Sequence, residues 1–247
     1  MRTFRAFVFI SLLAGCQRDP VQWSEAQIGL GLSAPREQMP RTSPDSSACP
    51  VSLRAASAGK FTYAAWWKVR ADSSAALMVA RSGDDGAWDE PAIADSSDQS
   101  RRGCGRPAPA ITADSVTGYV HLAYFLEPAA GPGIFSAHSM DSAVTFHAPV
   151  PIVFGNNPSR VSVASHADRV AVAYEDPNSD EPMIGVAFSR TMGHLFEARM
   201  QATSSDGRAK QPVIRVSKDS VYLWWSEYSA NPAVSATRRG YQAGKWR

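Results

Sequence analysis

The sequence predicts an all-β fold, a β-propeller of four-stranded antiparallel blades. Short runs of β-branched and aromatic residues, which are typical of strands, recur along the chain after residue 48. They recur in groups of about 50 residues, a period typical of propeller repeats with four strands per unit. No segment shows a sustained 3.6-residue hydrophobic period, so we expect little helix. The chain holds four such groups, and we expect four or five blades.

The second strand is the clearest element of each group, because it is rich in aromatic residues. The expected second strands are residues 61–67, 119–125, 170–174 and 221–225. The expected inner strands, which precede them, are 50–53, 109–111, 160–163 and 212–216. The expected third strands are 76–80, 133–137, 183–188 and 233–236, and the expected outer strands are 88–93, 146–152 and 196–201. Residues 23–28 resemble an outer strand and would either close the last blade or belong to an incomplete extra blade.

A recurrent turn follows the third strands. The first copy has Ser82, Asp84, Gly86 and Trp88. The second has Ser139, Asp141 and Phe146, with Ala143 at the glycine position. The third has Ser189, Gly193 and Phe196, with Thr191 at the aspartate position, and a degraded fourth copy spans 235–240. These turns resemble the Asp-box, Ser-x-Asp-x-Gly-x-x-Trp/Phe, of sialidases and related propellers, although the first copy is one residue short before Trp88.

We expect the three box turns to be structural. The aspartate of such a turn accepts hydrogen bonds from backbone N–H groups, and the glycine permits a positive φ. The aromatic residue buries itself between strands. In the family that these turns resemble, the box lies away from the ligand-binding face.

The sialidase resemblance also implies a site that the sequence does not reproduce. That family binds a sugar carboxylate with three arginines, the first in an Arg-Ile-Pro motif, and uses a tyrosine–glutamate pair and an acidic residue in catalysis. No Arg-Ile-Pro occurs here. The candidate ligand-face residues near the strand ends are Arg54, Arg106, Arg160, Arg215, Glu175 and Glu227. The alternative is that these side chains are solvated or paired with one another.

The aromatic pairs and the motif search complete the functional prediction. Neighbouring residues of a strand point to opposite faces, so the pairs Trp66–Trp67 and Trp224–Trp225 favour core packing over a carbohydrate-stacking platform. No nucleophile elbow, Walker loop or dinucleotide fingerprint occurs. We therefore expect a binding or scaffolding protein without catalysis. The alternatives are a diverged sialidase-like glycoside hydrolase and an assembly factor that docks another envelope protein.

The cysteines and histidines predict a disulfide and no metal or other cofactor. Cys49 and Cys104 each precede an inner strand of adjacent repeats, so we expect them to form a bridge rather than remain two buried thiols. The bridge would close a loop of about 55 residues, worth roughly 4 kcal/mol in the chain-entropy model. No Cys-x-x-Cys occurs, and His121, His138, His147, His166 and His194 show no metal-ligand spacing.

The N-terminus predicts a location in a bacterial cell envelope. Residues 1–15 form a signal peptide, with Arg2 and Arg5 before an apolar run too short to span a bilayer. Leu13-Ala14-Gly15-Cys16 resembles the lipobox of bacterial lipoproteins, which implies that Cys16 carries the lipid. The alternative is an ordinary signal peptide. Residues 16–48 would form a tether and possible closing strand, and residues 49–247 the propeller.

The expected partners are a membrane, reached through that lipid, and a glycan or envelope protein. Gln17 follows Cys16, and in a Gram-negative cell this resemblance implies the outer membrane. Net charge is +2, with 25 basic and 23 acidic residues and no dense basic stripe, so we expect no nucleic-acid partner.

Replacing Cys16 tests the anchor. Cys16→Ala should abolish labelling by a radioactive or clickable fatty acid and release the protein from membranes, because the thiol is the attachment point. Cys104→Ala is the control that should keep the label. Label retained by Cys16→Ala would contradict the lipoprotein assignment.

Overall fold

The computed structural model describes residues 19–29, 33–203, 208–228 and 238–247. The predicted signal peptide and Cys16 lie outside these residues. The described part is all-β apart from one short 3₁₀ helix, η1 (Pro50–Ser52). It contains no helix with the length and apolar character needed to cross a bilayer.

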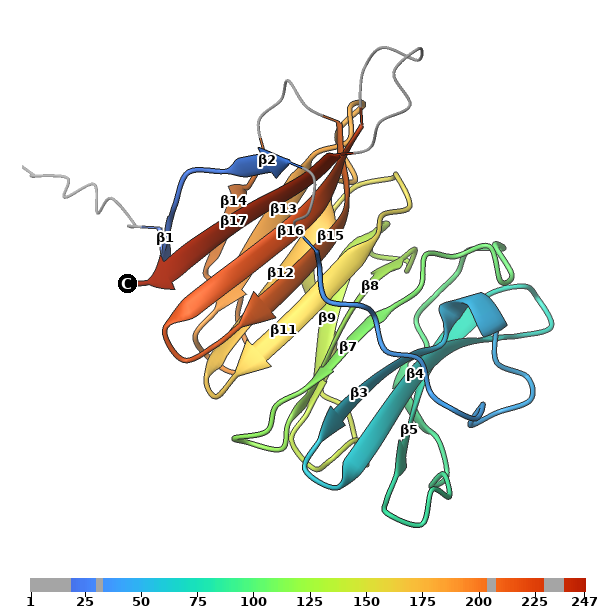
Figure 1. Ribbon diagram of the computed structural model, residues 1–247. Helices are drawn as coiled ribbons and strands as arrows, with labels where there is room; N and C mark the ends of the chain where they lie inside the picture. Colours follow the sequence, from blue (N-terminus) through green and yellow to red (C-terminus); the bar gives the residue numbers. More distant parts are fainter. Residues whose placement is uncertain (1–18, 30–32, 204–207, 229–237) are drawn as a thin grey trace, which may run out of the picture.

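The strands form four antiparallel sheets that follow one another along the chain (Figure 1). The first consists of β3 (Arg54–Ala58), β4 (Phe61–Val69), β5 (Ala75–Ser82) and β6 (Ala92–Asp95). The second consists of β7 (Ala110–Ala113), β8 (Val120–Leu126), β9 (Gly133–Ser139) and β10 (Val150–Phe154). The third consists of β11 (Val161–His166), β12 (Arg169–Glu175), β13 (Ile184–Ser189) and β14 (Ala198–Gln201). The all-β, four-stranded propeller prediction is confirmed.

The fourth sheet joins the two ends of the described chain. It consists of β15 (Arg208–Val216), β16 (Ser220–Tyr228) and β17 (Arg238–Trp246), with β1 (Val21–Trp23) and β2 (Gln27–Gly29) both paired to β17. The chain then crosses from this sheet to the first one along the inner strands (Figure 1). There Gln38 forms an isolated bridge with Ala55.

One strand prediction and one turn prediction were wrong. Residues 50–52 form η1 instead of an inner strand, because Pro50 begins a turn in which the Ser52 hydroxyl and amide both donate to the Cys49 carbonyl. The strand begins only at Arg54. Arg238–Gly240, expected in a fourth box turn, belong to β17. A Cβ at Gly240 would lie 1.9 Å from the Trp225 indole, so the glycine serves close packing within a strand. The rest of that predicted turn and the predicted strand 233–236 lie outside the described residues.

The central strands of the second and third sheets are buried on both faces, because each of these sheets lies between two others. Along β8, Val120, Leu122 and Tyr124 face the first sheet, whereas Ala123 and Phe125 face the third. All seven β8 residues are buried. Two-sided burial explains why the second strands read as nearly continuous runs of apolar residues.

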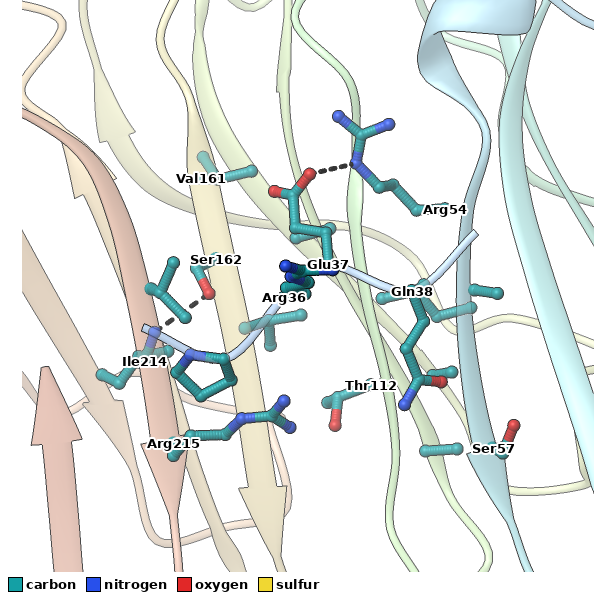
Figure 2. Close-up of a pocket in the computed structure, with 18 residues that line it drawn as sticks. Arg36, Glu37, Gln38, Arg54, Ser57, Thr112, Val161, Ser162, Ile214 and Arg215 are labelled. Carbon is teal, nitrogen blue, oxygen red and sulfur yellow. Dashed lines mark hydrogen bonds and ion pairs between the residues drawn. The ribbon is translucent and has the colours of Figure 1, made fainter. Parts of the chain in front are cut away.

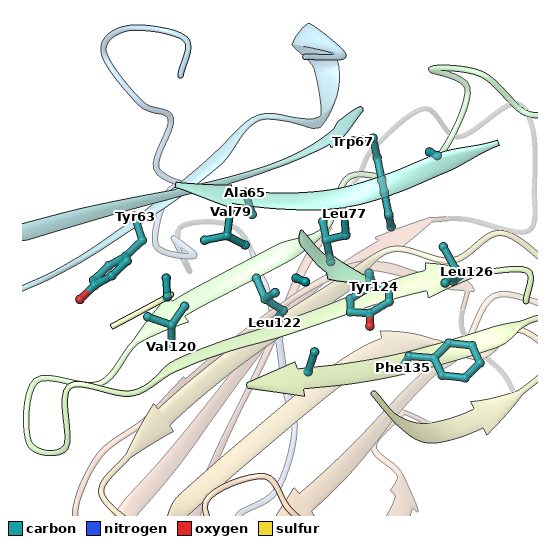
Figure 3. Close-up of a cluster of buried hydrophobic side chains, with 14 of the residues drawn as sticks. Tyr63, Ala65, Trp67, Leu77, Val79, Val120, Leu122, Tyr124, Leu126 and Phe135 are labelled. Carbon is teal, nitrogen blue, oxygen red and sulfur yellow. The ribbon is translucent and has the colours of Figure 1, made fainter. Parts of the chain in front are cut away.

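The contact between the first and second sheets is built from large side chains (Figure 3). Trp67 meets Tyr124 edge to face, with ring centroids 5.9 Å apart, and its indole N–H donates to the Pro107 carbonyl over 2.8 Å. Trp66 points to the opposite face and packs with Met78. Trp66, Trp67 and Trp225 are fully buried, in agreement with core packing.

The predicted disulfide is confirmed. Cys49 and Cys104 are bonded, with their Cα atoms 5.5 Å apart. The bond ties the segment before β3 to the loop before β7, so it joins the entries of two adjacent sheets.

The second and third box turns share one geometry. Ser139 Oγ accepts the Ala143 amide over 2.8 Å, and Asp141 Oδ1 accepts the Thr145 amide over 2.8 Å. Ser189 Oγ likewise accepts the Gly193 amide over 3.1 Å, and the hydroxyl of Thr191 replaces the carboxylate by accepting the Leu195 amide over 3.0 Å. Ala143 adopts a φ of 68° where the motif has glycine.

The first box turn differs, and the role predicted for Asp84 was wrong. Asp84 is exposed and makes no side-chain hydrogen bond among the described residues. Asp85 instead accepts the Ala87 amide over 3.2 Å. The missing residue before Trp88 shortens the turn, so the carboxylate one position later caps it. Trp88 is partly buried and packs on the outer side of the first sheet, Phe146 is partly buried, and Phe196 is buried.

Asp141→Ala should lower the free energy of unfolding by about 0.5–1.5 kcal/mol, because it removes the acceptor of the exposed Thr145 amide. Asp84→Ala should change it by less than about 0.5 kcal/mol. Urea unfolding with the disulfide intact measures both. Equal losses in the two variants would contradict the difference between the turns.

The Asp141 stabilisation should depend on pH. Burial raises the pKa of Asp141, but hydrogen bonds from Thr145 and Ser139 outweigh it and lower the pKa to about 2, from an ordinary 3.8. Since the folded pKa is the lower one, the contribution is present above about pH 4 and is lost as the pH falls toward 2.

Candidate functional site

The inner strands of the four sheets and residues 35–38 line a pocket, which we call the channel (Figure 2). Its volume is about 150 Å³, and β3, β7, β11 and β15 all contribute to its wall. Residues 35–38 lie within it, so the crossing segment fills part of the channel. The Ile214 amide donates to Ser162 Oγ over 3.1 Å, which joins the third and fourth sheets at this wall.

A larger pocket of about 580 Å³ adjoins the first at the end where the inner strands begin. We call it the channel mouth. Five arginines and two glutamates line it: Arg36, Arg54, Arg106, Arg160, Arg239, Glu37 and Glu175. This excess of guanidinium groups around a concave surface favours an anion, because guanidinium donates paired hydrogen bonds to carboxylates and phosphates.

The arginines of the mouth differ in how far they are already engaged. Arg54 pairs with Glu37 over 2.8 Å and also donates to the Leu53 carbonyl. Arg239 donates to Ser226 Oγ over 2.7 Å. Arg36 and Arg160 are exposed and have no carboxylate partner among the described residues. Arg36, Arg160 and Arg239 therefore remain available to a ligand.

Glu175 links two sheets at the mouth. Its Oε1 accepts the Gln211 amide over 2.9 Å, and its Oε2 accepts the Arg160 amide over 3.3 Å. Gln211 has a φ of 56°, unusual for a residue other than glycine, beside a bulge in β15. Backbone strain of this kind often accompanies a binding site. Glu175 thus holds the β11 and β15 entries in place, while its side chain still lines the pocket.

The ligand-face prediction was wrong for Arg106 and Glu227. The Arg106 guanidinium pairs with Asp98, with both side chains no more than 2% exposed, and it also donates to Ser100 and to the carbonyl of Ser73. Its charge is neutralised inside the fold. Glu227 accepts the Trp225 indole N–H over 2.5 Å and lines neither pocket. Arg215 lies in the narrower channel pocket, and Arg160 and Glu175 lie at the mouth.

Arg36, Glu37 and Arg239 were missed by the sequence reasoning. Arg36 and Glu37 belong to the crossing segment, which reads as a polar linker in the sequence. Arg239 belongs to β17 (Arg238–Trp246), whereas the sequence predicted the corresponding strand at residues 233–236. Nothing in the local residue pattern indicates that these side chains meet at the channel.

Tyr174, the tyrosine beside Glu175, is no candidate nucleophile. Burial, reinforced by Asp176, raises its pKa to about 12. The ring packs over Gly185, where a Cβ would lie 2.5 Å from it. The side chain therefore belongs to the packing between the second and third sheets.

The histidines that look scattered in the sequence are brought together in the structure. His138, His147 and His194 meet at the end of the molecule opposite the channel mouth. The absence of a local spacing motif was therefore misleading, because the three residues come from two sheets.

The fold has solved counterparts among glycosidases. No family model matches the chain, and no curated protein matches it. A Hadza microbial sialidase, Hz136, superposes with a TM-score of 0.51 at 17% identity, over 75% of this chain and 43% of the sialidase. An α-L-arabinanase from Penicillium chrysogenum superposes with a TM-score of 0.51 at 15% identity, over 79% of this chain and 64% of the arabinanase. The chain shares the β-propeller fold with both. It spans less than two thirds of either protein.

Arg106 and Arg160 should differ sharply in their effect on stability. Arg106→Ala leaves Asp98 buried and unpaired, so it should lower the free energy of unfolding by about 3–5 kcal/mol. Arg160→Ala should change it by less than about 0.5 kcal/mol. Thermal and urea unfolding measure the difference. A stable Arg106→Ala protein would show that the buried pair has no structural role.

Proposed function

We propose that the channel mouth binds an acidic glycan and that the protein is a diverged glycoside hydrolase of the sialidase-like propeller type. The observation that carries this proposal is the set of arginines around the 580 Å³ mouth, three of which have no carboxylate partner among the described residues. A sugar carboxylate fits such a set, because each guanidinium can donate two hydrogen bonds to it.

The hydrolase proposal assigns the acid and base chemistry to the two glutamates of the mouth. Glycoside hydrolysis generally needs a pair of carboxyl groups, and Glu37 and Glu175 are the two that line this pocket. The propeller fold shared with a sialidase and an arabinanase supports the same class of reaction.

A second candidate is glycan binding without turnover. The contacts that the two glutamates already make favour it. Glu37 is paired with Arg54, and both Glu175 oxygens accept hydrogen bonds from backbone amides. These carboxylates already accept hydrogen bonds from protein groups, which argues against a role in proton transfer.

We also propose that the site works outside the cytoplasm, on a domain tethered to a membrane through Cys16. The Cys49–Cys104 disulfide supports this location, because such bonds persist mainly in oxidising compartments. A glycan of the cell envelope is then the ligand within reach, and an envelope protein at the mouth is the other expected partner.

Arg160→Ala should weaken binding of a sialylated oligosaccharide about 10- to 100-fold, because it removes a charge-assisted contact. A glycan array followed by calorimetry measures this. Arg190→Ala, at an exposed arginine paired with Glu197, is the matched control and should bind normally. Equal affinity of the parent and Arg160→Ala proteins would exclude the mouth as the binding site.

Turnover of a fluorogenic sialoside separates the two candidate functions. A hydrolase should release the fluorophore, and Glu175→Gln should reduce the rate at least about 100-fold if the carboxylate acts in proton transfer. Binding without fluorophore release would overturn the hydrolase proposal and support the second candidate.

A further inference from the structure

The cluster of His138, His147 and His194 lies at the end of the molecule that the proposed function does not use. Antiparallel pairing makes the third strand run in the same direction as the inner strand. The inner strands begin at the channel mouth, so the third strands and their box turns end at the opposite end. His138 is the penultimate residue of β9, and His147 and His194 lie in or beside the second and third box turns.

The three imidazoles are close enough to share one ion. One ring nitrogen from each lies within 4.8 Å of the other two. The His138 ring stacks on that of His147, with centroids 4.6 Å apart, and meets the His194 ring edge to face at 4.3 Å. Neutral imidazole rings packed this closely stabilise one another only weakly in water. A metal ion between their nitrogens could bind all three.

The backbone places these rings. Along β9, Ile134 faces the third sheet and Phe135 faces the first, so alternation turns His138 toward the third sheet. The His147 amide donates to the His138 carbonyl over 2.9 Å, which holds the two residues side by side. The third box turn brings His194 across the gap between the sheets.

Gly193 lets the third box turn pack closely against His121 and His138. A Cβ at this position would lie 3.2 Å from His121 Nδ1 and 3.8 Å from His138 Nδ1. Gly193 also has a φ of 84°, which suits glycine. The turn therefore packs directly onto the two buried histidines and carries His194 with it.

The buried imidazoles lack hydrogen-bond partners. His138 is 2% exposed, and its Nε2 atom has no partner among the described residues. His121 stacks behind it, is 0% exposed, and has no partner for either ring nitrogen. Burial, together with His194 and His147, lowers the pKa of His138 to about 4, so the ring is neutral at neutral pH. Neutral imidazole is the form that binds metals.

We propose that His138, His147 and His194 form a binding site for a divalent transition-metal ion, with Zn²⁺ as the expected occupant. Nitrogen ligands suit zinc, copper and nickel, whereas calcium and magnesium prefer oxygen. A tetrahedral zinc site holds its nitrogens about 3.3 Å apart. His147 and His194 are exposed and can close the 4.8 Å spread by side-chain rotation. Three histidines leave the fourth position to water.

Zinc titration of the purified, tag-free protein tests the site. Calorimetry with Zn²⁺ alone should find one ion per chain, and Co²⁺ should give the visible spectrum of a tetrahedral site. His147→Ala and His194→Ala should each weaken Zn²⁺ binding at least about 10-fold, since loss even of a residue that supports a ligand costs that much. Both residues are exposed, so these variants should fold.

His166→Ala is the matched control, because His166 lies in the β11–β12 hairpin outside the cluster. It should bind Zn²⁺ like the parent protein, and added Zn²⁺ should raise the melting temperature of both. Failure of the parent protein to bind at millimolar Zn²⁺ would overturn the proposal. Unchanged affinity in the double variant His147→Ala, His194→Ala would also overturn it.

Discussion

Burial of the second and third sheets on both faces is the constraint on which the rest of this structure depends. A β8 strand with seven buried residues leaves no surface on which a polar side chain can reach water except at its ends. Alternation then assigns each residue of such a strand to one of the two neighbouring sheets, as Leu122 and Ala123 show by facing the first and third sheets. In these two sheets, functional groups are consequently confined to the ends of the strands and to the inner strands, where packing against a neighbouring sheet ceases.

The channel mouth follows from this confinement. The entries of the inner strands converge, and arginines at those positions share one pocket whatever their distance along the chain. Convergence of like charges is unfavourable, and the fold offsets part of it. Asp98 neutralises Arg106 inside the protein, and Glu37 of the crossing segment neutralises Arg54. Arg36, Arg160 and Arg239 have no carboxylate partner among the described residues, and they carry the positive charge that our proposal assigns to a ligand.

The strand pattern could be predicted from sequence because two-sided burial leaves a strong signal in the second and third strands. The inner strand at 50–53 was placed wrongly because Pro50 and Ser52 favour a turn that a run of apolar residues does not reveal. The roles of Asp84 and Arg106 were predicted wrongly because they depend on which groups lie nearby. In the shortened first box turn, Asp85 accepts the backbone amide instead of Asp84. The Arg106 guanidinium pairs with Asp98, eight residues earlier in the chain. The position of Arg36 and Glu37 at the channel could not be predicted, because it depends on the path of the crossing segment and not on the local sequence.

The structural box turns also determine where the three clustered histidines lie. Ser139 and Asp141 fix the second turn, which returns the chain so that His147 pairs with His138. Ser189 and Thr191 fix the third turn in the same geometry. Because equivalent turns of adjacent blades lie at the same end, a histidine in one turn is held near a histidine in the next. A repeated turn can thus bring together ligands that no local spacing predicts. The histidine cluster and the channel mouth lie at opposite ends of the sheets. Residues of either one can therefore be substituted without disturbing the packing between sheets that supports both.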